Sequence, residues 1–530
     1  MPRENKAPGA GEATGAGAVG IAAGDTYQQP HHTANGAGFQ EGAQDIEQEL
    51  AEQYGGALTS PAEIAAKRLA EEAEKALLKQ GAHDEGNAQT VHLRYRNRFC
   101  HNDAFGWMHH TGSHWTTEGA EAALDRAIVE TLGARIEAAL HSGAADKHSE
   151  LIKRCIPTAG KVQGAKYLLE SLAYVSPYAF DTEPDLLNCA NGVVDLRTGQ
   201  LISHSPSQRF THCTAVGYEP KADASVWLAF LAEVVGGGPD ALDWLQMAVG
   251  YTLTGHTREE ILFYLFGLRR SGKGTFTETL LALLGSPLAK EVNFGTFTAQ
   301  RTGDSQNFDL APLRPCRLVA ASESNSYERF NEAKLKALTG GNEVYCAFKH
   351  RDHFNYRPQF KIWLSSNEPV NADPDDDAVW GRLRVLSFPI SHAGHEDKLL
   401  KQRMRSPEVL KGVLAWAVEG ARRWYELGSS GLPELPISEE LKEKQRESLD
   451  AVQMWLEECR VNPERVPADA FMATADLYSS YRRWCEGNGQ TPKQMKGFTQ
   501  ALTRKGFAPD RARDEKTQQQ QRGFRGLQVL

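Results

Sequence analysis

The segment between residues 261 and 284 has the residue types and spacing of a phosphate-binding loop. An apolar run of strand length ends at Gly267, a short loop runs on to Gly272, and a helical pattern begins near Phe276. Glycines let backbone N–H groups turn inward around phosphate oxygens, and the positive end of the following helix adds to the attraction. Lys273 stands where a P-loop lysine reaches the β and γ phosphates. The segment therefore predicts a strand, loop and helix that bind a nucleotide.

The residues of this loop are candidates for contacts with nucleotide and metal. The expected nucleotide-binding set is Gly267, Ser271, Gly272, Lys273, Gly274, Thr275 and Phe276. Gly274 occupies the position after the lysine where a P-loop normally has Ser or Thr. Since Thr275 is the nearest hydroxyl, we expect it to be a ligand of Mg²⁺.

A second apolar run, residues 317–323, ends in the carboxylate of Glu323. An acid at the end of a buried strand beside the γ-phosphate can polarise the attacking water and help to hold Mg²⁺. Ser322 stands where many P-loop ATPases have an additional Asp, so Glu323 is expected to act alone or with Glu328. The alternative is an exposed acid at a strand end.

A third run, residues 360–367, ends in Asn367, whose amide suits a polar sensor of the γ-phosphate or of the attacking water. Arg382, or as second choice Arg384, could reach the nucleotide of a neighbouring subunit and neutralise charge that develops during hydrolysis. The alternatives are a turn asparagine and a surface arginine that pairs with an acid of residues 375–377.

Two stretches are basic enough to contact nucleic acid. Residues 344–354 read as a hairpin whose tip carries Lys349, His350 and Arg351, although a solvated basic turn would look the same. Between Lys493 and Arg525 nine Lys or Arg residues face three acids. Such local charge matters more for a phosphate backbone than the chain total of −9. The DNA-contacting residues expected here are Lys493, Lys496, Arg504, Lys505, Arg511 and Arg513.

Composition limits the class of protein. The chain has 530 residues, of which 41% are hydrophobic, and no apolar stretch approaches the length of about 18 residues that a membrane span needs. Its eight scattered cysteines form no Cys-x-x-Cys pair, and the cysteine and histidines of residues 100–114 fit no common zinc spacing. We expect a soluble cytoplasmic protein that does not bind membranes.

The pattern along the chain predicts an α/β fold in several parts. These are a Gly/Ala-rich tail (1–58), a charged helix and linker (59–88), a mixed α/β domain (89–240), the P-loop domain (241–428), a Gly/Ser/Pro-rich linker (429–439) and a small basic domain (440–530). In the last part, two helical patterns and two strand-like pieces resemble a winged-helix DNA-binding domain.

The order of these motifs resembles the phage/plasmid primase-helicase family, which is related to the poxvirus primase-helicase and belongs to the superfamily 3 helicases of the AAA+ class. The matching segments are 245–255, the P-loop, Ser322-Glu323, 335–341, 366–369 and 380–383. The chain departs from the family at Asn342, where an Asp is usual, and near Ala347, where an arginine is missing.

The resemblance implies a homohexameric ring that uses ATP and Mg²⁺ to move 3′ to 5′ on single-stranded DNA and to unwind forked duplex. It assigns phosphate binding to Lys273, the catalytic acid to Glu323, the sensor to Asn367 and the trans-acting arginine to Arg382. The pore hairpin falls on Lys349 and His350.

Other functions remain open at this stage. No Asp-x-Asp pair precedes the P-loop domain, so we expect no primase activity in this chain and a separate primase or polymerase as partner. One alternative is an origin-binding initiator in which ATP acts as a switch, without processive unwinding. A less favoured alternative is a phosphotransferase similar to nucleoside monophosphate kinases.

Overall fold

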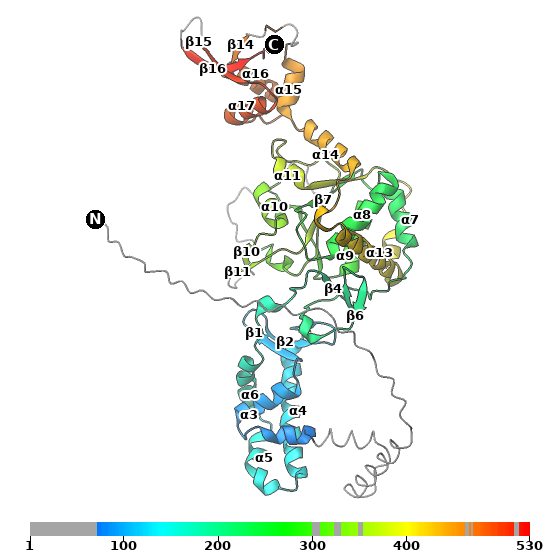
Figure 1. Ribbon diagram of the computed structural model, residues 1–530, viewed down its shortest axis with the longest axis vertical. Helices are drawn as coiled ribbons and strands as arrows, with labels where there is room; N and C mark the ends of the chain where they lie inside the picture. Colours follow the sequence, from blue (N-terminus) through cyan, green and yellow to red (C-terminus); the bar gives the residue numbers. More distant parts are fainter. Residues whose placement is uncertain are drawn as a thin grey trace, which may run out of the picture. The chain divides into compact units, whose positions relative to one another are not determined.

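A computed structural model of the protein describes residues 72–298, 308–322, 330–347, 353–461, 466–467, 470–513 and 519–529 (Figure 1). Several predictions fall outside these residues. They are the tail 1–58, the catalytic Glu323 with its helper Glu328, and the hairpin-tip residues Lys349, His350 and Arg351.

The region before the P-loop domain begins with a helical cluster that packs on a small sheet. The helices are α3 (Asp84–Arg94), α4 (Ala120–His141), α5 (Ser149–Cys155) and α6 (Ala159–Leu172), and the antiparallel strands are β1 (Phe99–Asn102), β2 (Gly106–His110) and β3 (Trp115–Thr116). Inside it the fully buried Arg135 donates to the side chain of Asn87 and to the carbonyl of Gly81. A buried charge is tolerated only with such partners, so this arginine ties α4 to the start of α3.

A second antiparallel sheet follows, formed by β4 (Leu186–Cys189), β5 (Gly192–Asp195) and β6 (Gln200–Ile202). A tight turn at Ala190 and Asn191 joins β4 to β5, because Cys189 pairs with Gly192 across a two-residue connection. Helices α7 (Ser225–Val234) and α8 (Gly238–Leu253) then lead into the P-loop domain.

The centre of the P-loop domain is a five-stranded parallel sheet in the order β13-β7-β12-β9-β8. Its strands are β7 (Leu262–Gly267), β8 (Ala289–Asn293), β9 (Leu318–Ser322), β12 (Lys361–Ser366) and β13 (Leu383–Phe388). The three apolar runs that predicted strands correspond to β7, β9 and β12, so these predictions are confirmed. Their unbroken apolar character is explained by a sheet covered on both faces.

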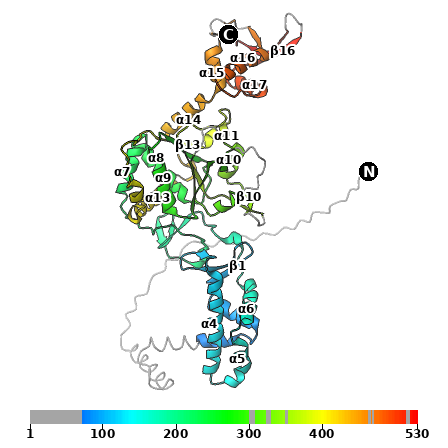
Figure 2. The ribbon, with the colours of Figure 1, turned by 180° about the vertical axis from the view of Figure 1, so that it is seen from behind.

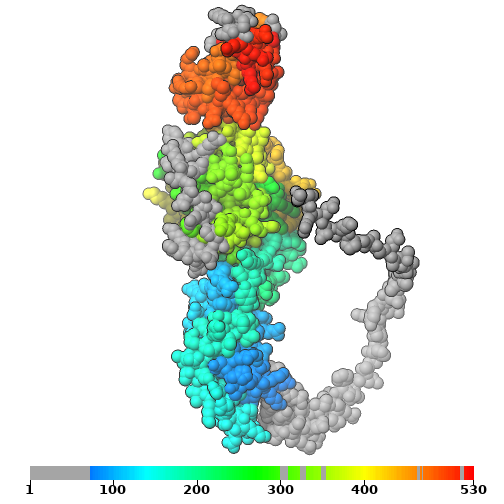
Figure 3. All heavy atoms as spheres, turned by 90° about the vertical axis from the view of Figure 1, so that its left-hand side faces the viewer, coloured from blue at the N-terminus to red at the C-terminus, as the bar shows by residue number. Residues whose placement is uncertain are grey.

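Residues of β7 alternate between two hydrophobic cores. Phe263 and Leu265 belong to the core formed with α7, α8, α9 (Lys273–Leu284) and α13 (Pro407–Glu426), whereas Leu262 and Tyr264 belong to the core on the opposite face. The second face is covered by α10 (Glu332–Thr339), α11 (Asp377–Arg382) and the hairpin of β10 (Val344–Ala347) and β11 (His353–Tyr356). Figure 1 shows the two sets of helices on opposite sides of β7, Figure 2 shows them from behind, and Figure 3 faces the side that carries α10 and α11.

The last part of the P-loop domain contains two successive helices. Helix α12 (Leu400–Met404) ends before Ser406, and α13 begins at Pro407. Proline has no N–H to donate to the preceding turn and is favoured at the first position of a helix, so Pro407 starts a new helix.

The C-terminal region contains a helical cluster and a three-stranded antiparallel sheet in the order β14-β16-β15. Its elements are α15 (Ala451–Cys459), β14 (Phe471–Ala473), α16 (Thr474–Gly487), α17 (Met495–Arg504), β15 (Pro509–Arg513) and β16 (Gln520–Arg525). The sequence predicted α16, α17 and the last two strands but missed α15 and β14.

A further helix, α14 (Pro436–Ser448), spans the junction between the expected linker (429–439) and the expected C-terminal part (440–530). This helix packs on the P-loop domain, where Ser438 Oγ accepts from the N–H of Val385 at 2.8 Å and Gln445 Oε1 from that of Val370 at 3.1 Å. Asp450, two residues after the end of α14, caps α15.

Helices α8 and α13 cross at two glycines. A Cβ atom on Gly250 would lie 2.0 Å from the backbone nitrogen of Ala421, and one on Gly420 would lie 1.9 Å from the carbonyl oxygen of Gln246. Only glycine allows this close approach, which brings α13 onto the sheet beside α8.

We predict that Gly250→Ala lowers the free energy of unfolding by about 2 kcal/mol, because the helices must separate to admit the methyl group. Gly133→Ala is the matched control. Gly133 lies inside α4 with no atom within 4 Å of its virtual Cβ, so alanine should leave stability unchanged or raise it by up to about 1 kcal/mol. Urea unfolding of both variants checks the prediction, and equal stabilities would contradict it.

Candidate nucleotide-binding site

The predicted P-loop connects β7 to α9. A Cβ atom on Gly267 would lie 2.1 Å from the carbonyl oxygen of Phe388 on β13, so no larger residue fits at the end of β7. Gly272 has φ +93° and would bring a Cβ within 2.8 Å of Val234 on α7. These two positions set the loop between the sheet edge and α7. Gly272 is also the N-cap of α9, so the first turn of this helix, which begins at Lys273, directly follows the loop.

Lys273 turns back into this loop. Its side chain is nearly buried, with 7% of the residue exposed. The ammonium donates to the carbonyls of Gly267 at 2.8 Å and Leu268 at 2.7 Å and to Ser271 Oγ at 3.2 Å. Burial lowers the pKa of Lys273 to about 8. The loop thus holds a poorly solvated cation on neutral oxygens, and an anionic phosphate would be a stronger partner.

Asn367 completes the group around the ammonium. It follows β12, which lies beside β7 with Ser366 opposite Phe266, so both strands end at the same edge of the sheet. Lys273 Nζ donates to Asn367 Oδ1 at 3.1 Å. The structure therefore joins two predicted site residues that are 94 positions apart in the sequence.

The remaining predicted nucleotide ligands have different surroundings. Ser271 and Thr275 are largely buried at the loop and in the first turn of α9. Gly274 is open, since only Glu278 approaches its virtual Cβ, at 3.9 Å. Phe276 is a core residue whose ring stacks on Trp227 at 5.6 Å, so only its backbone is available to a ligand.

The predicted catalytic acid follows β9, and β9 is separated from the P-loop strand by β12. Ser322 pairs with Ser365 of β12, so β9 ends at the same edge as the P-loop. Glu323 itself lies outside the described residues. Within the described parts of the chain there is no group of three His, Cys, Asp or Glu residues placed to hold a metal ion, and all eight cysteines are free thiols.

Arg382 lies at the opposite edge of the sheet. It is the last residue of α11, and the next residue, Leu383, pairs with Leu262 at the start of β7. The six residues of β7 separate it from the P-loop by about 20 Å, at roughly 3.3 Å per residue. Arg382 cannot reach the nucleotide site of its own chain across this distance.

At this edge Arg382 has partners that the sequence analysis did not identify. Its guanidinium donates to Glu260 Oε2 at 2.5 Å, to Thr339 Oγ1 at 3.2 Å and to the carbonyl of Ala378 at 2.9 Å. Arg384 on β13 donates to the carbonyls of Gly381 and Leu383 instead. Glu260 immediately precedes the P-loop strand, but nothing in a linear pattern links it to an arginine 122 residues away.

The predicted DNA-contacting residues fall into three groups. The β10–β11 hairpin is present, while its basic tip lies outside the described residues. Lys496, Arg511 and Arg513 are exposed. Lys493, Arg504 and Lys505 form ion pairs within the chain, the first two with acids of the P-loop domain that precede α11 and the third with Asp450.

Comparison with known proteins agrees with the motif order. Residues 88–236 match the family model described as "D5 N terminal like", and residues 265–382 match a family of unknown function, DUF5906. Over these two segments the chain is similar to the D5 primase-helicase region. The predicted resemblance is thereby confirmed, and the second match runs from the P-loop strand to Arg382.

Relatives of the D5 region occur in large DNA viruses. The chain is 24% identical over 342 residues to "Putative helicase L207/L206" of Acanthamoeba polyphaga mimivirus, a match that covers 59% of this chain and 35% of the relative. It is 25% identical over 303 residues to "Putative helicase 022R" of Frog virus 3 (isolate Goorha), covering 52% and 30%. The chain thus spans about a third of the length of these relatives.

Among solved structures, the apo structure of the NrS-1 C-terminal region aligns over 65% of this chain and 94% of that chain, with 11% identity. The TM-score of 0.38 is too low to establish a shared fold. Among the described helices, none is both long enough and apolar enough to cross a membrane.

We predict that nucleoside triphosphate affinity decreases as pH rises through the pKa of Lys273, about 8. The charged ammonium binds phosphate, so above this pH a proton must be taken up on binding, and affinity should decrease by up to about tenfold per pH unit. Equilibrium titrations between about pH 7.5 and 9.5 measure this decrease. A lysine with its ordinary pKa near 10.5 would keep affinity constant over that range, and that result would contradict the prediction.

Proposed function

We propose that this chain is the motor of an ATP-dependent replicative DNA helicase of a phage or mobile element. The observation that carries the proposal is the contact between the P-loop lysine and Asn367, at the edge where the parallel strands end. A buried cation after the loop of β7 and an amide sensor at the end of the neighbouring strand β12 suit a site that binds a triphosphate and also responds to its γ-phosphate. The names of the viral relatives support a helicase role.

Each residue of the site has a defined task in this proposal. Lys273 exchanges the oxygens of Gly267 and Leu268 for those of the β and γ phosphates, and it keeps Asn367 close to the γ-phosphate. Asn367 orients the attacking water, and Glu323 polarises it. The hydroxyl of Thr275, in the first turn of α9, is suited to hold Mg²⁺, which would neutralise phosphate charge when bound.

The site needs a second copy of the chain in this proposal. Arg382 lies about 20 Å from its own P-loop, on the edge where Glu260 and Thr339 hold its guanidinium. If one subunit places this edge against the P-loop edge of the next, Arg382 stabilises the charge that develops on the transferred phosphate. Such a heterologous contact closes into a ring, and we propose the hexamer of the AAA+ class that the sequence resemblance implies.

DNA contact is assigned to two elements. The β10–β11 hairpin would present Lys349, His350 and Arg351 to single-stranded DNA in the pore, and its movement during the ATP cycle would draw the strand through the ring in the 3′-to-5′ direction. The C-terminal helices and three-stranded sheet support the proposal of a winged-helix domain in this region. There α17 and the exposed arginines of β15 would bind phosphates rather than read bases.

The decisive experiment compares ATP hydrolysis by wild type and Lys273→Ala, each with and without single-stranded DNA. We expect DNA to stimulate turnover and the variant to lose it, because the variant lacks the buried ammonium that we assign to the β and γ phosphates. Lys398→Ala removes an exposed lysine of the same domain and should behave as wild type.

ATP hydrolysis that changes neither with DNA nor in Lys273→Ala would contradict the proposal that the chain is a DNA helicase motor. ATP binding without DNA-stimulated turnover would instead favour the alternative of an ATP-switched replication initiator. Phosphoryl transfer from ATP to AMP would favour a kinase.

A further inference from the structure

The C-terminal helix that we expect to bind DNA has a second partner inside the chain. Residues 373–377 form an acidic turn that immediately precedes and starts α11, and four of its five residues are aspartates. Lys493, at the start of the basic segment, donates to Asp373 Oδ1 and Asp375 Oδ2, both at 2.8 Å. Arg504, at the end of α17, lies 3.2 Å from Asp375 Oδ1 and donates to the carbonyl of Asp375.

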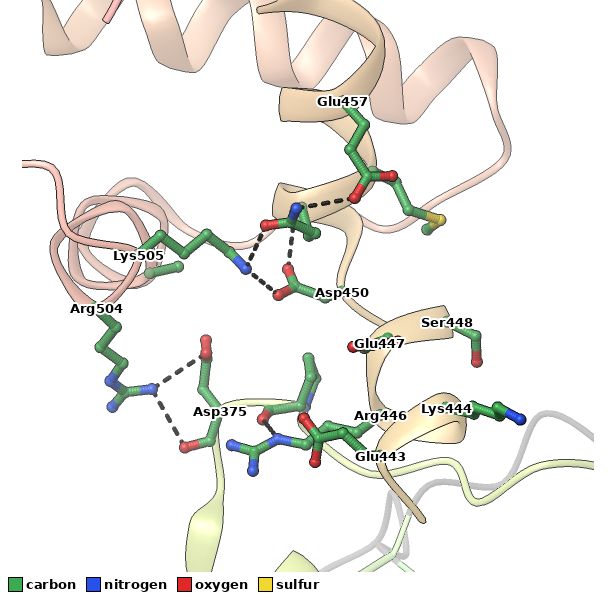
Figure 4. Close-up of a pocket in the computed structure, with 14 residues that line it drawn as sticks. Asp375, Glu443, Lys444, Arg446, Glu447, Ser448, Asp450, Glu457, Arg504 and Lys505 are labelled. Atoms are coloured by element: carbon green, nitrogen blue, oxygen red, sulfur yellow. Dashed lines mark hydrogen bonds and ion pairs between the residues drawn. The ribbon is translucent and has the colours of Figure 1, made fainter. Parts of the chain in front are cut away.

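These contacts involve the polar face of α17. Phe498, Ala501 and Leu502 are buried against the C-terminal core. The opposite face of α17 and the acidic turn together line a cleft of about 640 Å³. The residues of α17 in this cleft are Lys496, Gly497, Gln500 and Arg504. The acidic turn therefore occupies the same face that would have to meet a phosphate backbone. Figure 4 shows Arg504 pointing at Asp375 beside the neighbouring pair of Lys505 and Asp450.

The contact consists of ion pairs that differ in exposure. They bridge the cleft between the turn and α17. The side chain of Arg504 is 55% exposed, whereas those of Lys493, Asp373 and Asp375 are 20%, 33% and 25% exposed. Exposed and half-exposed ion pairs are individually weak and are screened by salt. A phosphate backbone offers the same cations several charges in a row, so it can replace two carboxylates.

The turn itself is held firmly. Asp376 caps α11 by accepting from the N–H groups of Ala378 and Val379, and Arg446 of α14 donates to the carbonyl of Pro374 at 2.6 Å. The acids therefore form a fixed docking surface on the P-loop domain. Helix α11 carries Arg382 at its other end, which places this surface on the element that bears the proposed trans-acting arginine.

We propose that the acidic turn is an internal mimic of nucleic-acid phosphate, which holds the basic face of α17 until DNA displaces it. The inference rests on the proposed DNA-binding role of the C-terminal region and adds its regulation. Without DNA, Lys493 and Arg504 are paired with Asp373 and Asp375. When DNA is bound, the same two cations contact phosphates, and the acidic turn beside α11 is released.

The test measures affinity of the full chain for a fluorescent single-stranded oligonucleotide, without nucleotide and at low salt. Asp373→Asn combined with Asp375→Asn removes the competing charges while keeping side-chain size, so binding should tighten by about threefold to tenfold. The gain should shrink as salt is added. Asp240→Asn combined with Glu408→Gln is the charge-matched control, since it removes two exposed acids of α8 and α13 that lie outside the acidic turn, and its affinity should equal that of wild type.

A second variant pair separates this inference from the proposed function. Lys493→Gln with Arg504→Gln should weaken binding, because these residues are the proposed phosphate contacts. If it does so while the double aspartate variant binds like wild type, the internal mimic is refuted and the DNA role of α17 stands. If it leaves affinity unchanged, α17 does not bind DNA, and both the mimic and that part of the proposed function fail. Asp375→Asn alone serves as the test if the double variant does not fold.

Discussion

The parallel arrangement of the central sheet is the constraint on which the rest of the structure depends. Because all five strands run in one direction, residues that follow strands gather at one edge and residues that precede them gather at the other. The P-loop and Asn367 meet at the first edge, whereas Glu260 and Arg382 meet at the second. The two halves of the proposed catalytic group are thus held apart within a chain by the length of β7.

The same sheet explains why Lys273 can be buried. Its strands are covered on both faces by separate cores, and Lys273 turns inward beside them, although residues 268–270 of the loop are exposed. A lysine there is stable only with hydrogen-bond acceptors on several sides, and two backbone carbonyls, Ser271 and Asn367 supply them. The lowered pKa and the strong demand for an anionic partner follow from one cause, the burial of the ammonium.

Local patterns in the sequence predicted much of this fold. The apolar runs that became β7, β9 and β12 were recognisable because a strand covered on both faces needs no polar alternation, and Lys273 and Asn367 were recognisable by their positions at strand ends. The start of α13 at Pro407 also has a local cause, because proline is favoured at the first position of a helix.

Other features depend on contacts between distant segments, which no local pattern encodes. The ion pair of Glu260 with Arg382 and the docking of Lys493 on Asp373 and Asp375 are of this kind. For the same reason α14 was divided between a linker and the C-terminal region. Its polar sequence does not reveal that Ser438 and Gln445 satisfy backbone groups of the P-loop domain. The basic residues of the C-terminal region were found by composition. The acids of residues 375–377 were considered only as ion-pair partners of Arg382, not of the C-terminal region.

The most direct test of the central claim mixes two inactive variants, Lys273→Ala and Arg382→Ala, and measures ATP hydrolysis. If Arg382 acts on the neighbouring subunit's nucleotide, some sites in the mixture are complete. In these sites the Arg382→Ala subunit supplies Lys273, and the adjacent Lys273→Ala subunit supplies Arg382. Random assembly then restores about a quarter of wild-type sites. We predict this recovery, with each variant inactive alone and as stable as wild type. A mixture that assembles but stays inactive would contradict a catalytic site shared between two copies of the chain.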